Sequence, residues 1–172
     1  DRCPPQIIGR IQHYISRKAM DIDGLGSETV SLLVENGLIQ NYADLYELTV
    51  SDILPLDRMA EKSALNLVAG VEASKNIPFE RVLFAIGIRY VGETVAKKLS
   101  KHYKSINGLA SASEQELINV DEIGDVIAKS VVDFFSLFEN NDIINRLKSY
   151  GVQLEISEKE LSNQTNKLEG NT

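Results

Sequence analysis

The chain of 172 residues has no tryptophan, a single cysteine and only four prolines. One cysteine excludes a disulfide framework within the chain. No apolar run has the length of a membrane span, and no basic and apolar leader resembles a secretory signal peptide. The first residue is not methionine, and we expect a part of a longer protein. The composition, 43% hydrophobic and 25% charged, indicates a globular, cytoplasmic protein without a membrane segment.

The net charge of −7 argues against a nucleic-acid partner at first sight, but the charges are segregated along the chain. Residues 81–104 hold six Lys or Arg against one Glu. Residues 112–142 hold eight acidic residues against Lys129. The segment 81–104 is therefore the part of the chain that favours a polyanion.

Four short turns, each followed by an amphipathic helical pattern, recur at intervals of 34, 32 and 32 residues, with their last positions at Gly26, Ala60, Gly92 and Gly124. A near-constant period indicates a repeat architecture. Positions 3, 4 and 7 after each turn predict one buried face per helix. They are Thr29, Val30, Leu33, Ser63, Ala64, Leu67, Val95, Ala96, Leu99, Ile127, Ala128 and Val131.

A longer period of 64 to 66 residues relates the first turn to the third and the second to the fourth, which indicates a duplicated pair. We predict an all-α fold of four tandem helix-hairpin-helix motifs near 20–34, 54–68, 86–99 and 120–132. The polar segment from 156 onward has no sustained period and is expected to be a disordered tail. Capping boxes are expected at Thr49 and Ser113.

Each turn is followed by a helix whose first N–H groups lack intrahelical acceptors. The N-terminus of such a helix binds anions. We expect Gly92 to take a positive φ or to allow close backbone approach. Basic residues around it favour DNA phosphates, although they could equally form a solvated helix face. The predicted DNA-binding residues are Gly24, Leu25, Gly26, Arg58, Met59, Ala60, Lys62, Arg89, Tyr90, Val91, Gly92, Thr94, Lys97, Lys98, Lys101 and Gly124.

The four turns are not equivalent. Arg58 and Ala60 replace both glycines of the second turn, and Glu122 replaces the first glycine of the fourth. The fourth turn is also surrounded by acidic residues, which repel phosphate. We therefore rank the third hairpin first for DNA contact, the first and second next, and the fourth last.

Four segments closely resemble the helix-hairpin-helix domain of bacterial NAD-dependent DNA ligases: Cys3–Gln6, Arg17–Gly26, Ala85–Ala96 and Ile123–Gly124. The resemblance covers about residues 1–155. It implies that 1–6 is the remnant of a zinc finger, 7–155 the helix-hairpin-helix domain, 156–166 a linker and 167–172 the truncated start of a BRCT domain. It also implies that Cys3 is the last of four zinc ligands, whose partners are absent from this chain.

The family seals nicks in DNA replication and repair with NAD, magnesium and zinc. Its nucleophile is a Lys in a Lys-x-Asp-Gly motif, and Asp21 stands at that position before Ile22-Asp23-Gly24. The resemblance therefore implies a non-catalytic, monomeric segment that binds nicked duplex DNA without sequence preference and holds no cofactor itself. Two alternatives remain open: a helix-hairpin-helix module of another DNA-repair factor, such as a nuclease or helicase subunit, and a helical protein-docking module.

Overall fold

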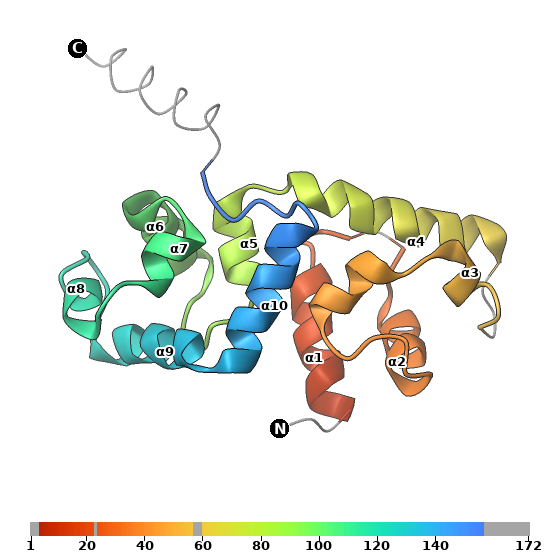
Figure 1. The fold of residues 1–172 in the computed structure, drawn as a ribbon, viewed down its shortest axis with the longest axis horizontal. Helices are drawn as coiled ribbons and strands as arrows, with labels where there is room; N and C mark the ends of the chain where they lie inside the picture. Colours follow the sequence, from red (N-terminus) through yellow and green to blue (C-terminus); the bar gives the residue numbers. More distant parts are fainter. Residues whose placement is uncertain (1–3, 23, 57–59, 157–172) are drawn as a thin grey trace, which may run out of the picture.

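The computed structural model describes residues 4–22, 24–56 and 60–156 (Figure 1). Within these residues the chain is helical, with one isolated bridge between Ser105 and Glu155 and no strand. The prediction of an all-α fold is confirmed. The helices are α1 (Pro4–Ile15), α2 (Ser27–Glu35), η1 (Tyr42–Glu47), α3 (Val50–Ile53), α4 (Glu61–Ala73), η2 (Ser74–Asn76), α5 (Phe79–Ala85), α6 (Glu93–Tyr103), α7 (Ile106–Ala110), α8 (Glu114–Ile118), α9 (Asp125–Ser136) and α10 (Phe138–Ser149).

The helices pack in pairs that fall into two halves. In the first half α1 packs on α2 and α3 on α4; in the second half α5 packs on α6 and α8 on α9. Figure 1 shows α6–α9 at one end of an elongated molecule and α2–α4 toward the other, with α1, α5 and α10 between them. Each helix pair is joined by one of the recurring turns. Among the described residues, no helix combines the length and apolarity needed to cross a bilayer.

Local capping follows the sequence signals. Both Thr49 and Ser113 form the predicted capping boxes, with Asp52 and Glu116 as their partners. Asn41 forms a third box with Asp44 at the start of η1.

The buried face of the four hairpin helices is narrower than predicted. Positions 4 and 7 after each turn are buried in all four helices, from Val30 and Leu33 to Ala128 and Val131. Position 3 lies at the edge of this face, because Ser63 is exposed and Thr29, Val95 and Ile127 are only partly covered. A polar residue at position 3 therefore lowers the free energy of unfolding only slightly.

A cluster of tyrosines fills the boundary between the two halves. The rings of Tyr14 and Tyr42 stack with their centroids 4.4 Å apart. The Tyr14 and Tyr46 hydroxyls lie 2.7 Å apart, and the Tyr46 hydroxyl lies 2.8 Å from that of Ser74. Tyr42 donates to the carbonyl oxygen of Ile86, after α5, at 3.0 Å. Burial raises the pKa of Tyr14 and of Tyr42, so both phenols stay protonated and able to donate.

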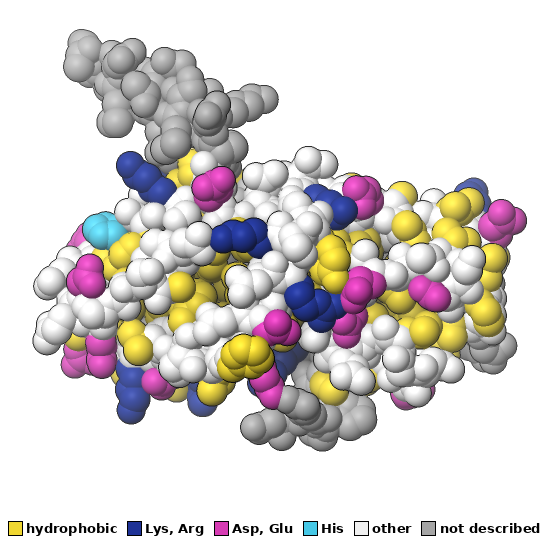
Figure 2. All heavy atoms as spheres, in the orientation of Figure 1, with side chains coloured by type: hydrophobic (Ala, Val, Ile, Leu, Met, Phe, Trp, Pro, Cys, Tyr) yellow, Lys and Arg dark blue, Asp and Glu magenta, His cyan; other side chains and the backbone are white. Residues whose placement is uncertain are grey.

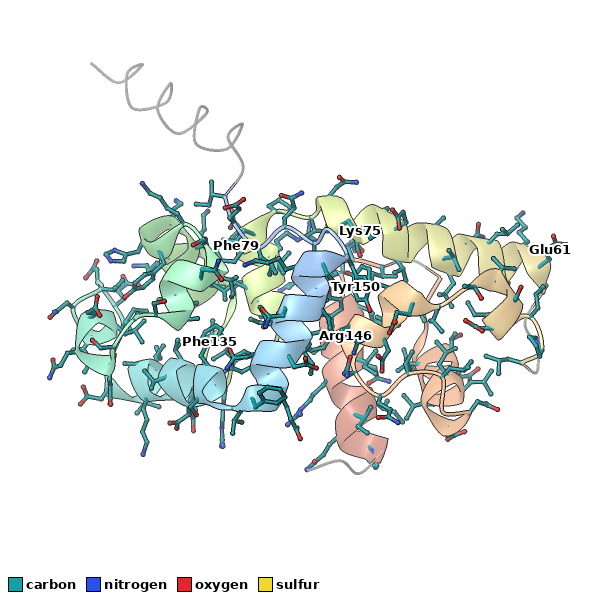
Figure 3. All side chains as sticks on the ribbon, in the orientation of Figure 1. Glu61, Lys75, Phe79, Phe135, Arg146 and Tyr150 are labelled. Atoms are coloured by element: carbon teal, nitrogen blue, oxygen red, sulfur yellow. The ribbon has the colours of Figure 1, made fainter. Side chains whose placement is uncertain are left out.

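Arg146 of α10 extends this cluster to the surface (Figure 3). Its guanidinium donates to Asp44 at 2.7 Å and to Glu47 at 2.5 Å, both on η1, and to the Tyr150 hydroxyl at 3.2 Å. Tyr150 in turn stacks on Tyr46, with centroids 5.7 Å apart. One arginine therefore ties the last helix to an element about a hundred residues earlier in the chain.

Replacing Tyr42 with phenylalanine should lower the free energy of unfolding by about 1–2 kcal/mol, because the buried Ile86 carbonyl loses its partner. The matched control is Tyr103→Phe, since the buried Tyr103 hydroxyl has no hydrogen-bond partner among the described residues. That variant should be as stable as the wild type or more so. Urea unfolding of the three proteins checks both, and equal losses would contradict the role given to Tyr42.

Candidate nucleic-acid interface

The first, third and fourth turns share one backbone path, in which a residue with positive φ is followed two positions later by an extended N-cap. The positive φ occurs at Gly24 (86°), Tyr90 (70°) and Glu122 (68°). The expectation of a positive φ at Gly92 is wrong, because the left-handed residue stands two positions earlier. The extended N-caps are Gly26 (φ −86°), Ala60 (−87°), Gly92 (−85°) and Gly124 (−90°).

The replacement of the second glycine by Ala60 does not disfavour the second hairpin. Ala60 has the same extended conformation as the three N-cap glycines, so alanine is unstrained there. Arg58 and Met59, also predicted to bind DNA, lie outside the described residues. Glu122 does occupy a left-handed position, where glycine would be more favourable.

The first N–H groups of the four hairpin helices have no acceptor within their helix. The first helical hydrogen bond in each is donated by the fourth residue, Val30, Ala64, Ala96 or Ala128, to the N-cap carbonyl. No N-cap side chain accepts from the three N–H groups before it. By contrast, side chains cap η1, α3, α7 and α8. The hairpin helices therefore begin with free donors at the positive end of their dipoles.

Glycine at these N-caps leaves the helix starts open. A Cβ built on Gly26, Gly92 or Gly124 would meet no atom within 4 Å among the described residues. The fold itself therefore does not require glycine at these positions. An anion could approach the backbone closely there, as phosphates do at other helix starts.

The middle residue of the first, third and fourth turns belongs to the core. Leu25 is 8% exposed, Val91 6% and Ile123 4%. Leu25 and Val91 were predicted to bind DNA, but burial leaves only their backbone groups for such a contact. Their side chains instead fix the turn against the helices beneath it.

The first, third and fourth turns are also held by the helix of the neighbouring hairpin. The Gly24 Cα lies so close to α4 that a Cβ would come within 3.3 Å of the Leu67 backbone. In the second half, Ser130 of α9 donates to the Arg89 carbonyl. Lys98 of α6 reciprocally pairs with Glu122 of the fourth turn. This reciprocity supports the predicted pairing of hairpins.

The predicted basic residues fall into different environments. Arg89, Lys97 and Lys101 are exposed, and so are Lys62 and Thr94. Lys98 is not a free cation, because its ammonium lies 2.5 Å from the Glu122 carboxylate. The guanidinium of Arg89 lies over the Tyr90 ring, 5.1 Å from the centroid. Of the four exposed predicted cations, Arg89, Lys97 and Lys101 belong to the third hairpin and Lys62 to the second.

Two further cations, Arg17 and Lys18, lie just before the first turn and were not among the predicted binding residues. Lys18 lies 3.8 Å from Glu93, the first residue of α6. Arg81 of α5 donates to the Arg17 carbonyl at 2.8 Å. The segment just before the first turn therefore lies beside the start of α6 and beside α5. The adjacent pair Arg17-Lys18 just before the first turn was the available sequence signal.

Acidic side chains also stand at the helix starts, one in the first turn of each hairpin helix: Glu28, Glu61, Glu93 and Asp125. They interact favourably with the helix dipole but repel phosphate. In Figure 2, basic and acidic side chains alternate over the face shown, so this face has no continuous basic surface among the described residues. A polyanion would therefore contact separate points along the molecule.

The described residues contain no group of three or more His, Asp or Glu side chains arranged to hold a metal ion. Cys3, the predicted zinc ligand, lies outside them. The side chain of His13 instead bonds the Phe84 carbonyl at 2.8 Å. We therefore assign no metal chemistry to the described part of the chain.

Paired helices joined by tight turns, with open N-termini on the second helix of each pair, are the features of helix-hairpin-helix motifs. Residues 81–144 match the family model described as helix-hairpin-helix motif. This match covers the third and fourth turns.

Over nearly its whole length the chain is similar to part of several bacterial proteins named DNA ligase. It is 70% identical over 170 residues to the protein of Christiangramia forsetii, covering 99% of this chain and 26% of the relative. It is 68% identical over 168 residues to that of Flavobacterium psychrophilum (98% and 25%) and 47% identical over 170 residues to that of Halothermothrix orenii (99% and 25%). The chain spans about a quarter of the length of these relatives. The resemblance to the helix-hairpin-helix segment of DNA ligases is confirmed.

The two glycine positions of a turn should respond differently to alanine. Gly24→Ala should lower the free energy of unfolding by about 1–3 kcal/mol, since it combines a positive φ with a close backbone contact. Gly92→Ala should change it by less than about 1 kcal/mol, because its Cβ enters open space in an extended conformation. Thermal and urea unfolding measure both variants. A loss at Gly92 as large as that at Gly24 would refute this assignment of the turn.

Proposed function

We propose that this chain is the non-catalytic, duplex-DNA-binding part of an NAD-dependent DNA ligase that seals nicks in replication and repair. The observation that carries the proposal is the set of four helix starts with free N–H donors, three of them opened further by an N-cap glycine. Such starts recognise phosphate and carry no base information, so binding is sequence-independent. The similarity to a quarter of each DNA ligase supports the same assignment.

The chemistry of sealing would lie elsewhere in the parent protein. The Lys-x-Asp-Gly motif is absent, and Asp21 occupies the place of the lysine. NAD, magnesium and zinc would then serve the parent enzyme, with Cys3 as one of four zinc ligands. This chain would supply grip on the DNA and would act as a monomer on nicked duplex.

The hairpins would contribute unequally. The third has Arg89, Lys97 and Lys101 exposed around its turn and helix, together with Lys18 from the first turn. Around the fourth, Glu122 and Asp125 are exposed beside the open helix start. We therefore assign the strongest phosphate contact to the start of α6.

Fluorescence anisotropy of a labelled nicked duplex, titrated with the chain at several salt concentrations, tests the proposal. Binding should be independent of sequence, and log affinity should fall with log salt by about 0.9 per phosphate neutralised, with a total of several phosphates. An intact duplex of the same sequence shows whether the nick matters. A folded protein that does not bind at low salt would refute DNA binding by this chain and favour protein docking.

A matched pair of charge reversals tests the ranking of the hairpins. Lys97 and Lys129 hold the same position, five residues after Gly92 and Gly124, and both are exposed. Lys97→Glu should weaken duplex binding several-fold at low salt and reduce the salt slope by about one phosphate. Lys129→Glu should have a clearly smaller effect. Equal losses in the two folded variants would contradict the assignment to α6.

A further inference from the structure

Tyr90 differs from the other tyrosines of the chain in its surroundings. Of the six tyrosines, Tyr14 and Tyr42 are buried in the core, and Tyr46, Tyr103 and Tyr150 are packed against it. Tyr90 belongs to neither group and is 56% exposed at the third turn. The fold therefore does not depend on its ring for packing.

The backbone at Tyr90 is unfavourable for a large side chain. Its φ of 70° lies in the left-handed region, where a bulky residue is an outlier. The equivalent residues have an internal explanation: Gly24 lies against the α4 backbone, and Glu122 pairs with Lys98. No comparable contact within the described residues accounts for tyrosine at position 90. Backbone strain that no contact within the fold explains is characteristic of functional sites.

The surroundings of Tyr90 hold it rigidly beside the free donors of α6. Val91 anchors the turn in the core on one side, and Ser130 bonds the Arg89 carbonyl on the other. The Arg89 guanidinium lies over the exposed ring, 5.1 Å from its centroid. Two residues later Gly92 opens the helix start. An aromatic ring, a cation and an anion site thus follow one another within four residues.

We propose that Tyr90 contacts the nucleoside next to the phosphate bound at the start of α6, with its ring against the apolar face of that nucleoside. Aromatic side chains bind nucleosides in this way without reading sequence. Arg89, stacked on the same ring, directs its charge to the adjoining phosphate. This inference rests on the proposed DNA binding and adds a specific residue to it.

The first experiment compares Tyr90→Gly with Glu122→Gly, two substitutions at the same left-handed position of the third and fourth turns. Both relieve the backbone, and in Glu122→Gly this gain offsets the lost ion pair with Lys98, so both variants should stay folded with a thermal stability close to that of the wild type. Tyr90→Gly should lower affinity for the nicked duplex about fivefold or more, because the aromatic contact is lost. Glu122→Gly removes a negative charge and should leave affinity unchanged or raise it.

Four outcomes can be told apart in this assay. A wild-type chain that does not bind the duplex overturns the proposed function. A wild-type chain that binds, together with a Tyr90→Gly variant of equal affinity, overturns only the role of Tyr90. Equal losses in both glycine variants also overturn it, since they would reflect the turn backbone instead of the ring. A loss confined to Tyr90→Gly supports it.

The absence of tryptophan from the chain allows a direct readout of the contact. Tyr90→Trp places one indole at the third turn, and His102→Trp places one near the other end of α6, about 14 Å away along the helix axis. Adding unlabelled duplex should protect the indole of the Tyr90→Trp variant from acrylamide quenching and leave that of the His102→Trp variant accessible. Full accessibility of the indole in the bound Tyr90→Trp variant would overturn the proposal.

Discussion

The polar cluster around Arg146 and the tyrosines holds the two halves of the molecule in one frame. Arg146 bonds two carboxylates of η1, while Tyr42 reaches the carbonyl that follows α5. These bonds join α10 to η1 and η1 to the segment leading into the third turn. A DNA duplex presents phosphates at fixed spacing, so hairpins can grip it together only if they are held at fixed separations. The cluster joins distant parts of the chain, including the segment that leads into the third turn.

Within this frame the helix N-termini differ in how they are capped. Side chains of Asn41, Thr49, Ser105 and Ser113 cap η1, α3, α7 and α8, whereas η2, α5 and α10 have no side-chain cap. The four hairpin helices lack side-chain caps, and their starts remain open. An acidic residue in each first turn favours the dipole without filling the free N–H groups. Open donors thus coexist with a stable helix.

Much of this arrangement could be predicted from the sequence because the local signals repeat. The period of the turns, the buried positions 4 and 7, and the boxes at Thr49 and Ser113 all depend on residues close together in the chain. The position of the positive φ could not be read reliably, because Gly, Tyr and Glu occupy it in the described turns. The pairing of Lys98 with Glu122 and the arrival of Lys18 beside Glu93 depend on packing between distant segments. The tyrosine cluster was missed for the same reason.

The reciprocal contacts of the third and fourth hairpins define the smallest part of the chain that can be structurally complete. Ser130 braces the third turn from α9, and Lys98 braces the fourth from α6. A single excised hairpin would lose the brace that its neighbour supplies. Gain or loss of these modules through recombination should therefore preserve structure only when the boundaries fall between pairs. The matched family segment, residues 81–144, encloses one such pair.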